Sequence, residues 1–414
     1  MVWDIIFWLS LVAGLVIGGT FFRDLGDVSQ MVMKVKRDKM IRAIRNEKRT
    51  TIFGLGLLVV MAIAHLGFGA GPAWAFWLTV ALVSLFFGFP YVWLHVGLRH
   101  QRDKAQYYNL DEARKFINPS TSVLVIENAG DARAHSDYDL SRPHLASTPD
   151  GLGGEKNVII AYCSMANLGI GYKAEIEGRR LEVDVLAQHG NNLLLRDKET
   201  GEPIQHIYGQ RICDLAPSSD GQSHCDLTAG RVGMPFWPTF RMSFRAFQKA
   251  YPHGTVFLNK PVGNPLLRLI DMVIDAVLAV SLAQHHREEA PIMDNMTHYD
   301  DRLPNKTYIW GIEIRGDAVA YTEDFVFEHD CVINAKIGGR AIVVAYDVKM
   351  ESLGFWFNDS SQAVTRIDFW GKSDQGQLER VEMLRPGMFW HVWAEYFPNT
   401  DLNRINEQSE ASTI

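Results

Sequence analysis

The chain has 414 residues, of which 47% are hydrophobic and 21% charged, and its formal net charge is −7. This apolar content excludes an intrinsically disordered chain, and the negative charge provides no basic field for a nucleic-acid partner. Its four cysteines are too few and too scattered for a disulfide framework.

The first hundred residues contain three apolar segments, at 2–22, 51–68 and 73–96. Each has close to the roughly 20 residues that a helix needs to cross the hydrocarbon core of a bilayer. A helix is expected because a backbone exposed to lipid must satisfy its own hydrogen bonds. We therefore predict three transmembrane helices with the lipid bilayer as a partner. The first segment has no Lys or Arg before Arg23, which disfavours its alternative interpretation as a cleaved signal peptide.

Positive charge is concentrated between the first two apolar segments. Residues 23–49 contain nine Lys and Arg residues, whereas the connection between the second and third segments, GFGAGPAW, has no charge. Because positively charged loops stay cytoplasmic, we predict an integral protein of a bacterial inner membrane with a cytoplasmic C-terminal part; a periplasmic location is the alternative. The basic loop is either a solvated orientation signal or an amphipathic helix on anionic lipid headgroups.

After the membrane part, the sequence predicts a β-rich region. Residues 106–118 are typical of a short helix that ends at Asn118-Pro119. From Ser122 the chain alternates between β-branched runs and Gly or Asn, as in SVLVIENAG, NVIIAYC and RLEVDVLAQ, and these are strand and turn signals. The run VIIAY is apolar on both faces and predicts a central strand.

Two helices are predicted in the middle of the chain. The first covers 239–250 and leads into a strand. The second, PLLRLIDMVIDAVLAVSLA at 265–283, carries Arg268, Asp271 and Asp275 on one face and apolar residues over the rest. Three interpretations of this helix are open: packing in the core, docking in the membrane interface, or contact with other membrane proteins. Its three charges make it a poor fourth span.

The segment that follows repeats the first β-rich region. The sequence reads GDARAH around Gly130 and GDAVAY around Gly316, and each copy continues with a His, a Gly-Gly pair and an apolar run, VIIAYC or AIVVAYD. The offset between the copies stays at about 185 residues. We predict an internal duplication that covers 122–186 and 308–370.

These elements together predict a mainly β (α+β) domain built by internal duplication and preceded by three transmembrane α-helices. The expected organisation is a membrane anchor at 1–100, a first β-rich repeat at 101–260, an amphipathic helical insertion at 261–298, a second β-rich repeat at 299–400 and a polar tail at 401–414. The tail is expected to fray because it is polar and terminal.

Four motifs occur in order between Ser122 and Trp370: VIIAYC, GIGYKAEIEGRRLEV, NNLLLRDKETG and DDRLPNKTYIWGIEIRGDAVAY. Together they resemble the family named domain of unknown function 3179. The resemblance implies a fold unit rather than an activity. In that family Cys-Pro-Leu-Cys is usual where this chain has Cys163, but Ala166 replaces the second cysteine here, which argues against a dithiol or a two-thiolate metal site. Members often carry export signals, which favours the periplasmic alternative.

A second family segment, of the type NSDLVMYDRETGSLWSQ, is similar to GNNLLLRDKETGEPIQH here. Asp197 matches the family pattern, whereas Asn192 stands where Asp is usual and Ile204 where Trp is usual. We take Asn192, Asp197 and His206 as candidate ligand-binding residues.

His144, Cys163 and Met165 are the candidate metal ligands, since the histidine loop immediately precedes the strand that carries the thiol. One nitrogen and two sulfur ligands favour soft metals, copper(I) first, and His189 or His206 would complete the set. A nucleophilic Cys163 with His144 as its base is the thiol alternative. A structural interpretation, in which all of these are ordinary buried residues, stays open beside both.

The sequence contains no complete catalytic set, no glycine-rich phosphate loop and no GxSxG or HExxH motif. We therefore expect a membrane-anchored accessory or interaction protein of unestablished activity that presents its duplicated domain at the membrane surface. The alternatives are a soft-metal or thiol-dependent redox protein centred on Cys163 and a small-ligand binder between the repeats. The sequence leaves open whether the chain is an enzyme.

Overall fold

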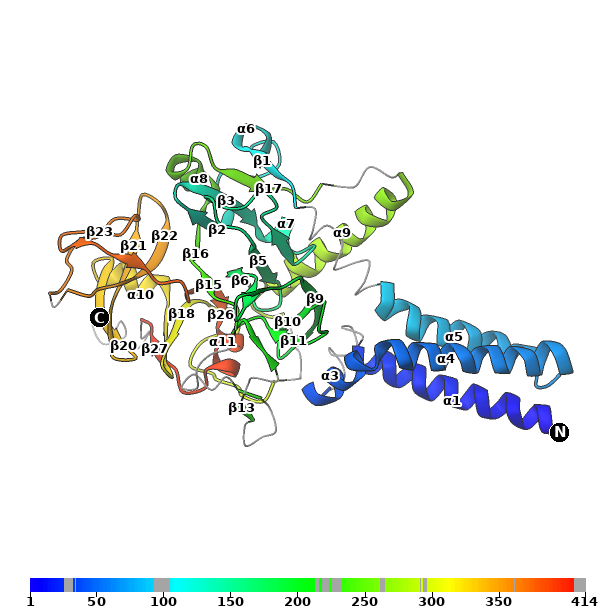
Figure 1. The fold of residues 1–414 in the computed structure, drawn as a ribbon. Coiled ribbons are helices and arrows are strands. Elements are labelled where there is room, and N and C mark those ends of the chain that lie inside the picture. The colour runs from blue at the N-terminus through cyan, green and yellow to red at the C-terminus, as the bar shows by residue number, and fades with distance from the viewer. Residues whose placement is uncertain are drawn as a thin grey trace, which may run out of the picture. The chain divides into compact units, whose positions relative to one another are not determined.

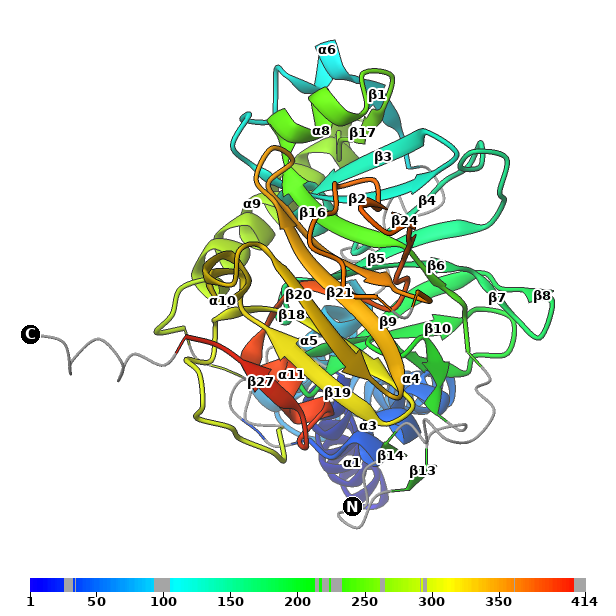
Figure 2. The same ribbon diagram turned by 90° about the vertical axis from the view of Figure 1, so that its left-hand side faces the viewer.

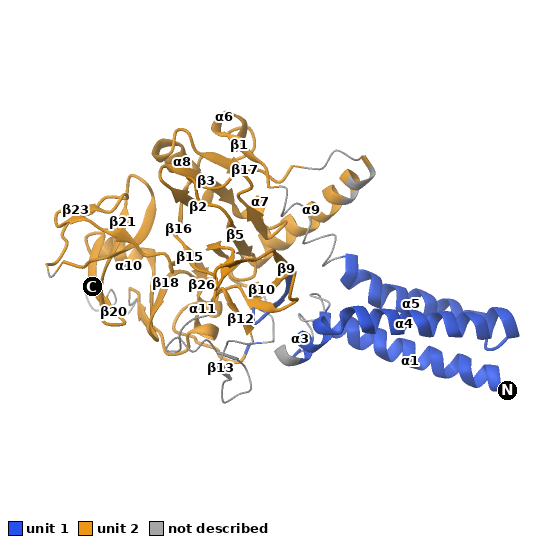
Figure 3. Cartoon of the chain, viewed as in Figure 1, with its two compact units in different colours: residues 1–98, 186–191, 292–296 blue, residues 99–185, 192–291, 297–414 orange. Residues whose placement is uncertain are grey.

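The computed structural model of the chain (Figure 1) describes residues 1–25, 33, 35–92, 105–212, 216–217, 223–224, 233–260, 265–290, 292, 296–360 and 362–405. The chain divides into two compact units (Figure 3). Unit 1 comprises residues 1–98, 186–191 and 292–296, and unit 2 comprises residues 99–185, 192–291 and 297–414.

Unit 1 is built on three long apolar helices, α1 (Val2–Leu25), α4 (Glu47–Ala62) and α5 (Ala73–Tyr91). A π-helical turn over Ile63–Gly67 extends α4. The three helices lie side by side (Figure 1), and Phe7, Met61 and Phe76 belong to their shared core. Each is long and apolar enough to cross a membrane, which agrees with the prediction of a membrane anchor.

A short helix, α3 (Arg37–Arg45), lies in the basic stretch between α1 and α4. Met40, Ile41 and Ile44 are buried, whereas Arg42 and Arg45 are exposed. The basic stretch is therefore an amphipathic helix over these residues. Its contact with lipid headgroups stays a prediction.

Unit 2 contains two groups of elements that follow the same order. The first group is β2 (Ser122–Asn128), β3 (Asp131–Ser136), α7 (Asp137–Leu140), β4 (Leu145–Ser147), β5 (Val158–Cys163) and β6 (Leu168–Lys173). The second group is β18 (Tyr308–Ile314), β19 (Asp317–Tyr321), α10 (Glu323–Glu328), β20 (Val332–Ile337), β21 (Arg340–Asp347) and β22 (Ser352–Phe357).

Each group is later joined by a strand–helix–strand segment. These segments are β16 (Thr239–Ser243), α8 (Phe244–Ala250) and β17 (Thr255–Phe257), and β26 (Arg385–Phe389), α11 (Trp390–Tyr396) and β27 (Asp401–Asn403). The resulting sheets have the orders β17-β3-β2-β16 and β27-β19-β18-β26. In both sheets the first pair is parallel and the other two pairs are antiparallel.

A second sheet in each group is also built alike. The strands β4, β5 and β6 pair in sequence order and are extended by β15 (Phe236–Trp237). The strands β20, β21 and β22 pair in the same way and are extended by β25 (Glu379–Arg380). All six residues of β5 are buried, which confirms the prediction of a central strand.

The first hairpin of each group has the same turn chemistry. The amide of Gly130 donates to Glu127 Oε1 at 3.1 Å, and the amide of Gly316 donates to Glu313 Oε1 at 2.7 Å. Both glycines have a positive φ, of 83° and 91°, in a conformation that residues with a Cβ rarely adopt. The repeated GDA motif therefore forms the same turn twice.

The Gly-Gly pairs also occupy equivalent places. The amide of Gly153 donates to Asp131 Oδ2 at 3.0 Å, and the amide of Gly338 donates to Asp317 Oδ2 at 3.1 Å. A Cβ on Gly153 would lie 2.2 Å from the carbonyl oxygen of Asn128, the last residue of β2. A Cβ on Gly338 would lie 2.2 Å from the carbonyl oxygen of Ile314, the last residue of β18. Glycine is required at both places because the backbones approach closely.

The remaining elements lie before the first group, between the two groups or after β22. They are β1 (Tyr107–Asn109), α6 (Leu110–Ala113), β7 (Glu175–Ile176), β8 (Arg179–Arg180), β9 (Val183–His189), β10 (Asn192–Asp197), β11 (Pro203–Gln205), β12 (Gln210–Arg211), β13 (Ala216–Pro217), β14 (Ser223–His224), α9 (Pro265–His285), β23 (Lys372–Ser373) and β24 (Gly376–Gln377). Strands β9 to β12 form a four-stranded sheet in sequence order.

The expected helix over 106–118 is wrong at both ends, because α6 covers only Leu110–Ala113 and turns follow it. Residues Tyr107–Asn109 form β1, which pairs with β17, and α6 begins only after Asn109. The Asn109 side chain accepts a hydrogen bond from the amide of Glu112 and caps the helix. The pairing of β1 depends on a partner far along the chain, which local pattern does not reveal.

The expected helix over 239–250 is wrong in its first part. Its first five residues form β16, which pairs with β2, and only Phe244–Ala250 is helical. The Ser243 side chain accepts a hydrogen bond from the amide of Ala246, so the helix begins there.

Two of the hydrophobic cores of unit 2 lie on the two faces of β2. Val123 and Val125 pack into a cluster with Phe247 from α8, whereas Leu124 and Ile126 pack against residues of β4 and β5 on the other face. The two groups meet where β16 contacts β22 and β26 contacts β6, and Figure 2 shows β16 alongside the strands of the second group.

Candidate functional site

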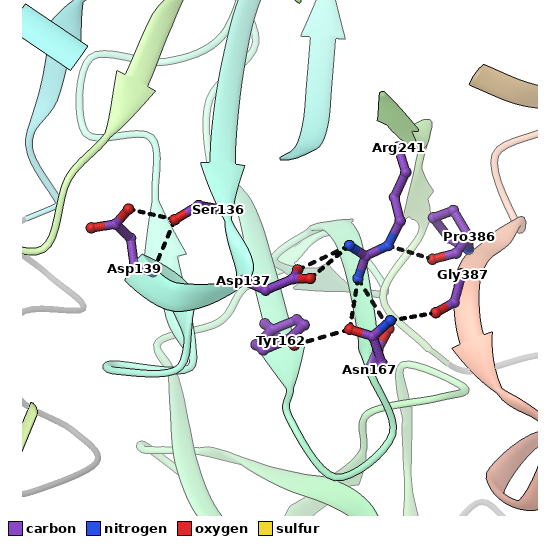
Figure 4. A network of polar contacts seen from close by, with 8 residues as sticks. All are labelled: Ser136, Asp137, Asp139, Tyr162, Asn167, Arg241, Pro386 and Gly387. Carbon is purple, nitrogen blue, oxygen red and sulfur yellow. Dashed lines mark hydrogen bonds and ion pairs between the residues drawn. The ribbon is translucent and has the colours of Figure 1, made fainter. Parts of the chain in front are cut away.

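Arg241, in β16, is the centre of a buried polar network (Figure 4). Its Nη1 donates to both carboxylate oxygens of Asp137, at 3.0 and 2.9 Å. Its Nε donates to the carbonyl oxygen of Pro386 at 2.9 Å. Its Nη2 donates to the main-chain oxygen and to Oδ1 of Asn167, at 3.1 and 3.2 Å. All the nitrogens of this guanidinium group therefore have acceptors in the protein.

Asn167 extends the network to the second group of unit 2. Its Oδ1 accepts a hydrogen bond from the Tyr162 hydroxyl at 3.1 Å, and its Nδ2 donates to the carbonyl oxygen of Gly387 at 2.7 Å. Asn167 lies in the turn between β5 and β6, and Gly387 lies in β26. A buried charge is costly unless it is paired and hydrogen-bonded. This network meets both conditions and joins the two groups.

Burial and pairing set the protonation states of the network. Burial acts to lower the pKa of Arg241, but the charge and hydrogen bonds of Asp137 outweigh it and leave that pKa raised. Burial raises the pKa of Tyr162 well above its ordinary value, and it also raises the pKa of Tyr308 nearby. At neutral pH the network therefore holds a guanidinium cation and neutral phenols.

A cavity of about 310 Å³ lies beside this network. Both groups of unit 2 contribute to its lining, which includes Asp137, Asn167, Arg241, Tyr308, Glu323 and Tyr346. We call it the repeat cavity. Its lining combines carboxyl groups, amide and hydroxyl groups and aromatic rings.

Glu323 differs from the other carboxyl groups of the repeat cavity. Burial raises its pKa, although a hydrogen bond from Tyr346 acts in the opposite direction. Asp137 is paired with Arg241. Glu351 is paired with Arg245 at 2.7 Å, and this hydrogen bond lowers the Glu351 pKa. Within the described part of the chain, no ion pair forms to Glu323, so its carboxyl group has a hydrogen bond from Tyr346 but no cationic partner.

The predicted metal ligand His144 interacts electrostatically with His206. Both rings are buried, and Nδ1 of each has no hydrogen-bond partner among the described residues. Burial lowers the pKa of His144 to about 4 and that of His206 to about 3, and the charge of His144 contributes to the second shift. Nε2 of His206 lies 3.1 Å from the carbonyl oxygen of Ala161.

Cys163 and Met165 are also buried, at 2% and 4% exposure. Cys163 interacts electrostatically with Lys306. Burial lowers the pKa of Lys306 to about 8, and its Nζ, 4.6 Å from the centre of the Phe389 ring, has no hydrogen-bond partner among the described residues. The described residues contain no group of three or more His, Cys, Asp or Glu that is arranged to hold a metal ion. The copper site stays a prediction.

The predicted ligand-binding residues Asn192, Asp197 and His206 do not line the repeat cavity. Asn192 Oδ1 accepts hydrogen bonds from Gln205 Nε2 at 2.8 Å and from the amide of Ile207 at 3.1 Å. Asp197 lies at the opposite end of β10 and binds the Arg179 guanidinium at 2.6 Å. Asn192 and His206 therefore lie close together, and Asp197 does not join them. Their role in ligand binding stays a prediction.

The family model described as "Protein of unknown function (DUF3179)" matches residues 88–400, about three quarters of the chain. The chain belongs to this family. The DUF3179 region begins near the end of α5 and ends just before β27, so it contains the Arg241 network and the repeat cavity. No curated protein and no solved structure matches the chain significantly.

Sequence reasoning did not select the central residues of this DUF3179 site. Arg241 is the single charged residue in the run TFRMSF, and a charged residue inside a buried strand was the available signal. Asp137 directly follows β3 and is the first residue of α7, where a carboxylate also stabilises the N-terminus of the helix. Nothing in the sequence indicated that these two residues, 104 positions apart, would pair.

Proposed function

We propose that this chain is a membrane-anchored binding protein that takes up a small polar ligand in the repeat cavity. The observation that carries the proposal is the cavity of about 310 Å³ between the two groups of unit 2. Clefts between structural units are common ligand sites. Neither a histidine nor a cysteine belongs to the described lining, so a nucleophile–base pair of that kind is lacking there. This favours binding, in an accessory role, over catalysis.

We also propose that the two groups arose by internal duplication. Identical strand orders with identical parallel and antiparallel pairings support this, as do the matching hydrogen bonds of Gly130 with Glu127 and of Gly316 with Glu313. The correspondence extends beyond 122–186 and 308–370, because the strand–helix–strand segments that include α8 and α11 occupy equivalent places. A cavity between two such copies is lined by equivalent elements of each.

The anchoring part of the proposal depends on the N-terminal helices. Three helices suit a bilayer by length and composition, and the basic residues between α1 and α4 favour the cytoplasmic side for that connection. Unit 2 then lies on the cytoplasmic face of a bacterial inner membrane. Presentation of a binding domain at a membrane surface suits an accessory subunit of a membrane assembly.

The lining of the repeat cavity favours a cationic ligand. The guanidinium of Arg241 is already paired with protein acceptors, so it is not available to an anion. Glu323 has no cationic partner within the described residues, and the rings of Tyr308 and Tyr346 lie in the same lining. A carboxylate together with aromatic faces attracts an ammonium group through charge and cation–π interactions. We therefore propose an amine as the ligand class.

Binding by the full-length protein in mild detergent tests this proposal. Choline, a quaternary ammonium, and spermidine, a polyamine, serve as the cationic probes, and citrate serves as the anionic probe. We expect an amine to raise the thermal unfolding midpoint, because a ligand at 100 times its Kd stabilises the folded state by about 2.7 kcal/mol. Glu323→Gln should abolish this shift. Asp324, the neighbouring exposed carboxylate, is the matched control, and Asp324→Asn should retain the shift of the midpoint.

Two results would contradict the proposal. One is stabilisation by citrate but by neither amine. The other is an amine effect that survives in Glu323→Gln, because binding would then take place elsewhere. Mass spectrometry of small molecules released on denaturation provides an independent readout, in which a co-purified amine is expected.

A second candidate function, thiol or soft-metal chemistry at Cys163, is favoured by one observation. The buried amine of Lys306 lies close enough to Cys163 for their charges to interact, and it has no hydrogen-bond partner in the described residues. A nearby cation stabilises a thiolate, the form that binds metals. Copper titration of the full-length protein tests this: stoichiometric binding that Cys163→Ser abolishes and Cys331→Ser retains supports it, and equal binding by both variants excludes it.

A further inference from the structure

Helix α9 places its charged side against the rest of unit 2. The side chain of Arg142, which follows α7, is 2% exposed, and its Nη2 lies 2.6 Å from Asp271 Oδ1. Its Nη1 lies 2.8 Å from Asp275 Oδ1. Asp271 is itself 4% exposed. Two residues of the polar stripe predicted from the sequence, Asp271 and Asp275, therefore lie on the inward face of α9, whereas its third residue, Arg268, is exposed.

The opposite face of α9 is apolar and exposed. Five large side chains on it are between 51% and 61% exposed, namely Leu269, Met272, Val273, Val277 and Val280. They follow one another at steps of three, one, four and three residues, which places them along one side of a helix. We call this set the α9 outer face. A helix on the surface of a water-soluble domain usually has the reverse arrangement, with the apolar stripe inward.

We propose that the α9 outer face lies in the interfacial region of the bilayer in which the chain is anchored. The helix has 21 residues, so it is about 31 Å long, which suits a helix lying in the membrane plane. Such helices bury an apolar face about 5–10 Å into the boundary between headgroups and acyl chains. Arg287, beyond the last turn of α9, is exposed, and a basic side chain at such a position reaches lipid phosphates.

The short connection between α5 and β1 makes lipid, rather than a protein partner, the expected occupant of the α9 outer face. The last candidate span ends at Tyr91 and β1 begins at Tyr107. A connection of this length extends at most on the order of 50 Å. Unit 2 is therefore always within reach of the bilayer, so the membrane surface is present at high effective concentration, whereas a protein partner must first arrive by diffusion. The ion pairs of Arg142 hold α9 with its outer face accessible.

Site-specific photocrosslinking of the full-length protein in lipid nanodiscs tests this proposal. Benzoylphenylalanine replaces Val277 on the α9 outer face in one variant. In the control variant it replaces Val348, which is 61% exposed in the turn after β21. We expect lipid adducts at position 277 at least tenfold more abundant than at position 348. Crosslinks from position 277 to a protein partner or a second copy, or equal lipid adducts at both positions, would overturn the proposal.

Hydrogen exchange provides a second test that separates this proposal from the anchoring on which it rests. In nanodiscs, residues 265–285 of the native protein should exchange at least tenfold more slowly than in the Val273→Asp/Val277→Asp double variant. In mild detergent the exchange rates of the native protein and the double variant should differ less. Failure to incorporate into nanodiscs would contradict the anchoring. Incorporation without lipid adducts at position 277, or with equal exchange in both proteins, would contradict the docking of α9 alone.

Discussion

Arg241 and Arg142 are both almost completely buried, and carboxylates hold each of them in place. Arg241 binds Asp137 and main-chain oxygens of both groups of unit 2, and Arg142 binds Asp271 and Asp275 of α9. The fixed fork of a guanidinium group suits such multidentate pairing. Each arginine therefore fastens one element of the fold to another.

His135 allows a test of burial at a single position. Its ring is completely buried, with Nδ1 3.3 Å from the carbonyl oxygen of Leu124 and Nε2 3.0 Å from the Tyr107 hydroxyl. Burial lowers its pKa from 6.5 to about 3, and the charge of Arg133 adds to this shift. Between pH 6.5 and 3 the unfolded chain therefore binds more protons at this residue than the folded protein does. Stability is lost as the pH falls through this window.

We predict that His135→Phe reduces the acid sensitivity of unit 2. Between pH 6 and pH 4 the native protein should lose up to about 2.7 kcal/mol more than the variant, because each pH unit corresponds to about 1.4 kcal/mol for one proton. Thermal unfolding midpoints across this range measure the difference. His253 is exposed, so His253→Phe is the control, and an equal effect of both substitutions would contradict the prediction.

The sequence pattern of α9 predicts the helix itself but not which of its faces is inward. The sequence predicts a helix over 265–283, and the structure has it over Pro265–His285. The sequence also predicts one polar stripe of Arg268, Asp271 and Asp275, of which Arg268 is exposed. Which face is inward depends on Arg142, which is 129 positions from Asp271. A periodic pattern defines the two faces of a helix but not the surroundings of each.

We predict that Arg142→Met releases α9 from unit 2. Removing one partner of a buried ion pair costs about 3–5 kcal/mol, because Asp271 would be left as a buried carboxylate without this cation. Hydrogen exchange of residues 265–285 in mild detergent should accelerate by at least tenfold. Arg268→Met, in the same helix but at an exposed position, should have little effect. Unchanged exchange in Arg142→Met would show that other contacts hold the helix.

The two groups of unit 2 form one structure through the Arg241 network. Asn167 reaches Gly387 across 220 positions of sequence. A Cβ on Gly387 would lie 2.8 Å from Cδ and 2.9 Å from Nε of Arg241. The absence of a side chain at this position therefore makes room for the arginine. We therefore expect cooperative unfolding of the two groups to depend on this close approach.

We predict that Gly387→Ala destabilises unit 2 more than Gly316→Ala does. Both glycines have a positive φ, of 69° and 91°, so both substitutions carry backbone strain of about 1 kcal/mol. Only Gly387→Ala also displaces Arg241, since nothing lies within 4 Å of a Cβ on Gly316. We expect an additional loss of about 1–3 kcal/mol. Tryptophan fluorescence during thermal unfolding should show one transition at a lower midpoint, and equal midpoints would contradict the coupling.

The amino-acid sequence by itself determined the local features of this protein. Apolar segments of bilayer length predict the three N-terminal helices, the run VIIAYC predicts a buried strand, and the GDA motifs predict turns at Gly130 and Gly316. These features depend on neighbouring residues alone, through hydrophobic period and through the backbone freedom of glycine. They also indicated family membership, because the motifs occur in order along the chain.

Tertiary structure alone decided which side chains meet. Arg241 and Asp137 come together because β16 and β3 flank β2 in one sheet, and the repeat cavity exists because two such sheets pack against each other. The structure also brings His144 into electrostatic interaction with His206, and Cys163 with Lys306. Pairing of strands from distant parts of the chain sets these contacts, and the periodicity of one strand says nothing about which strand will lie beside it.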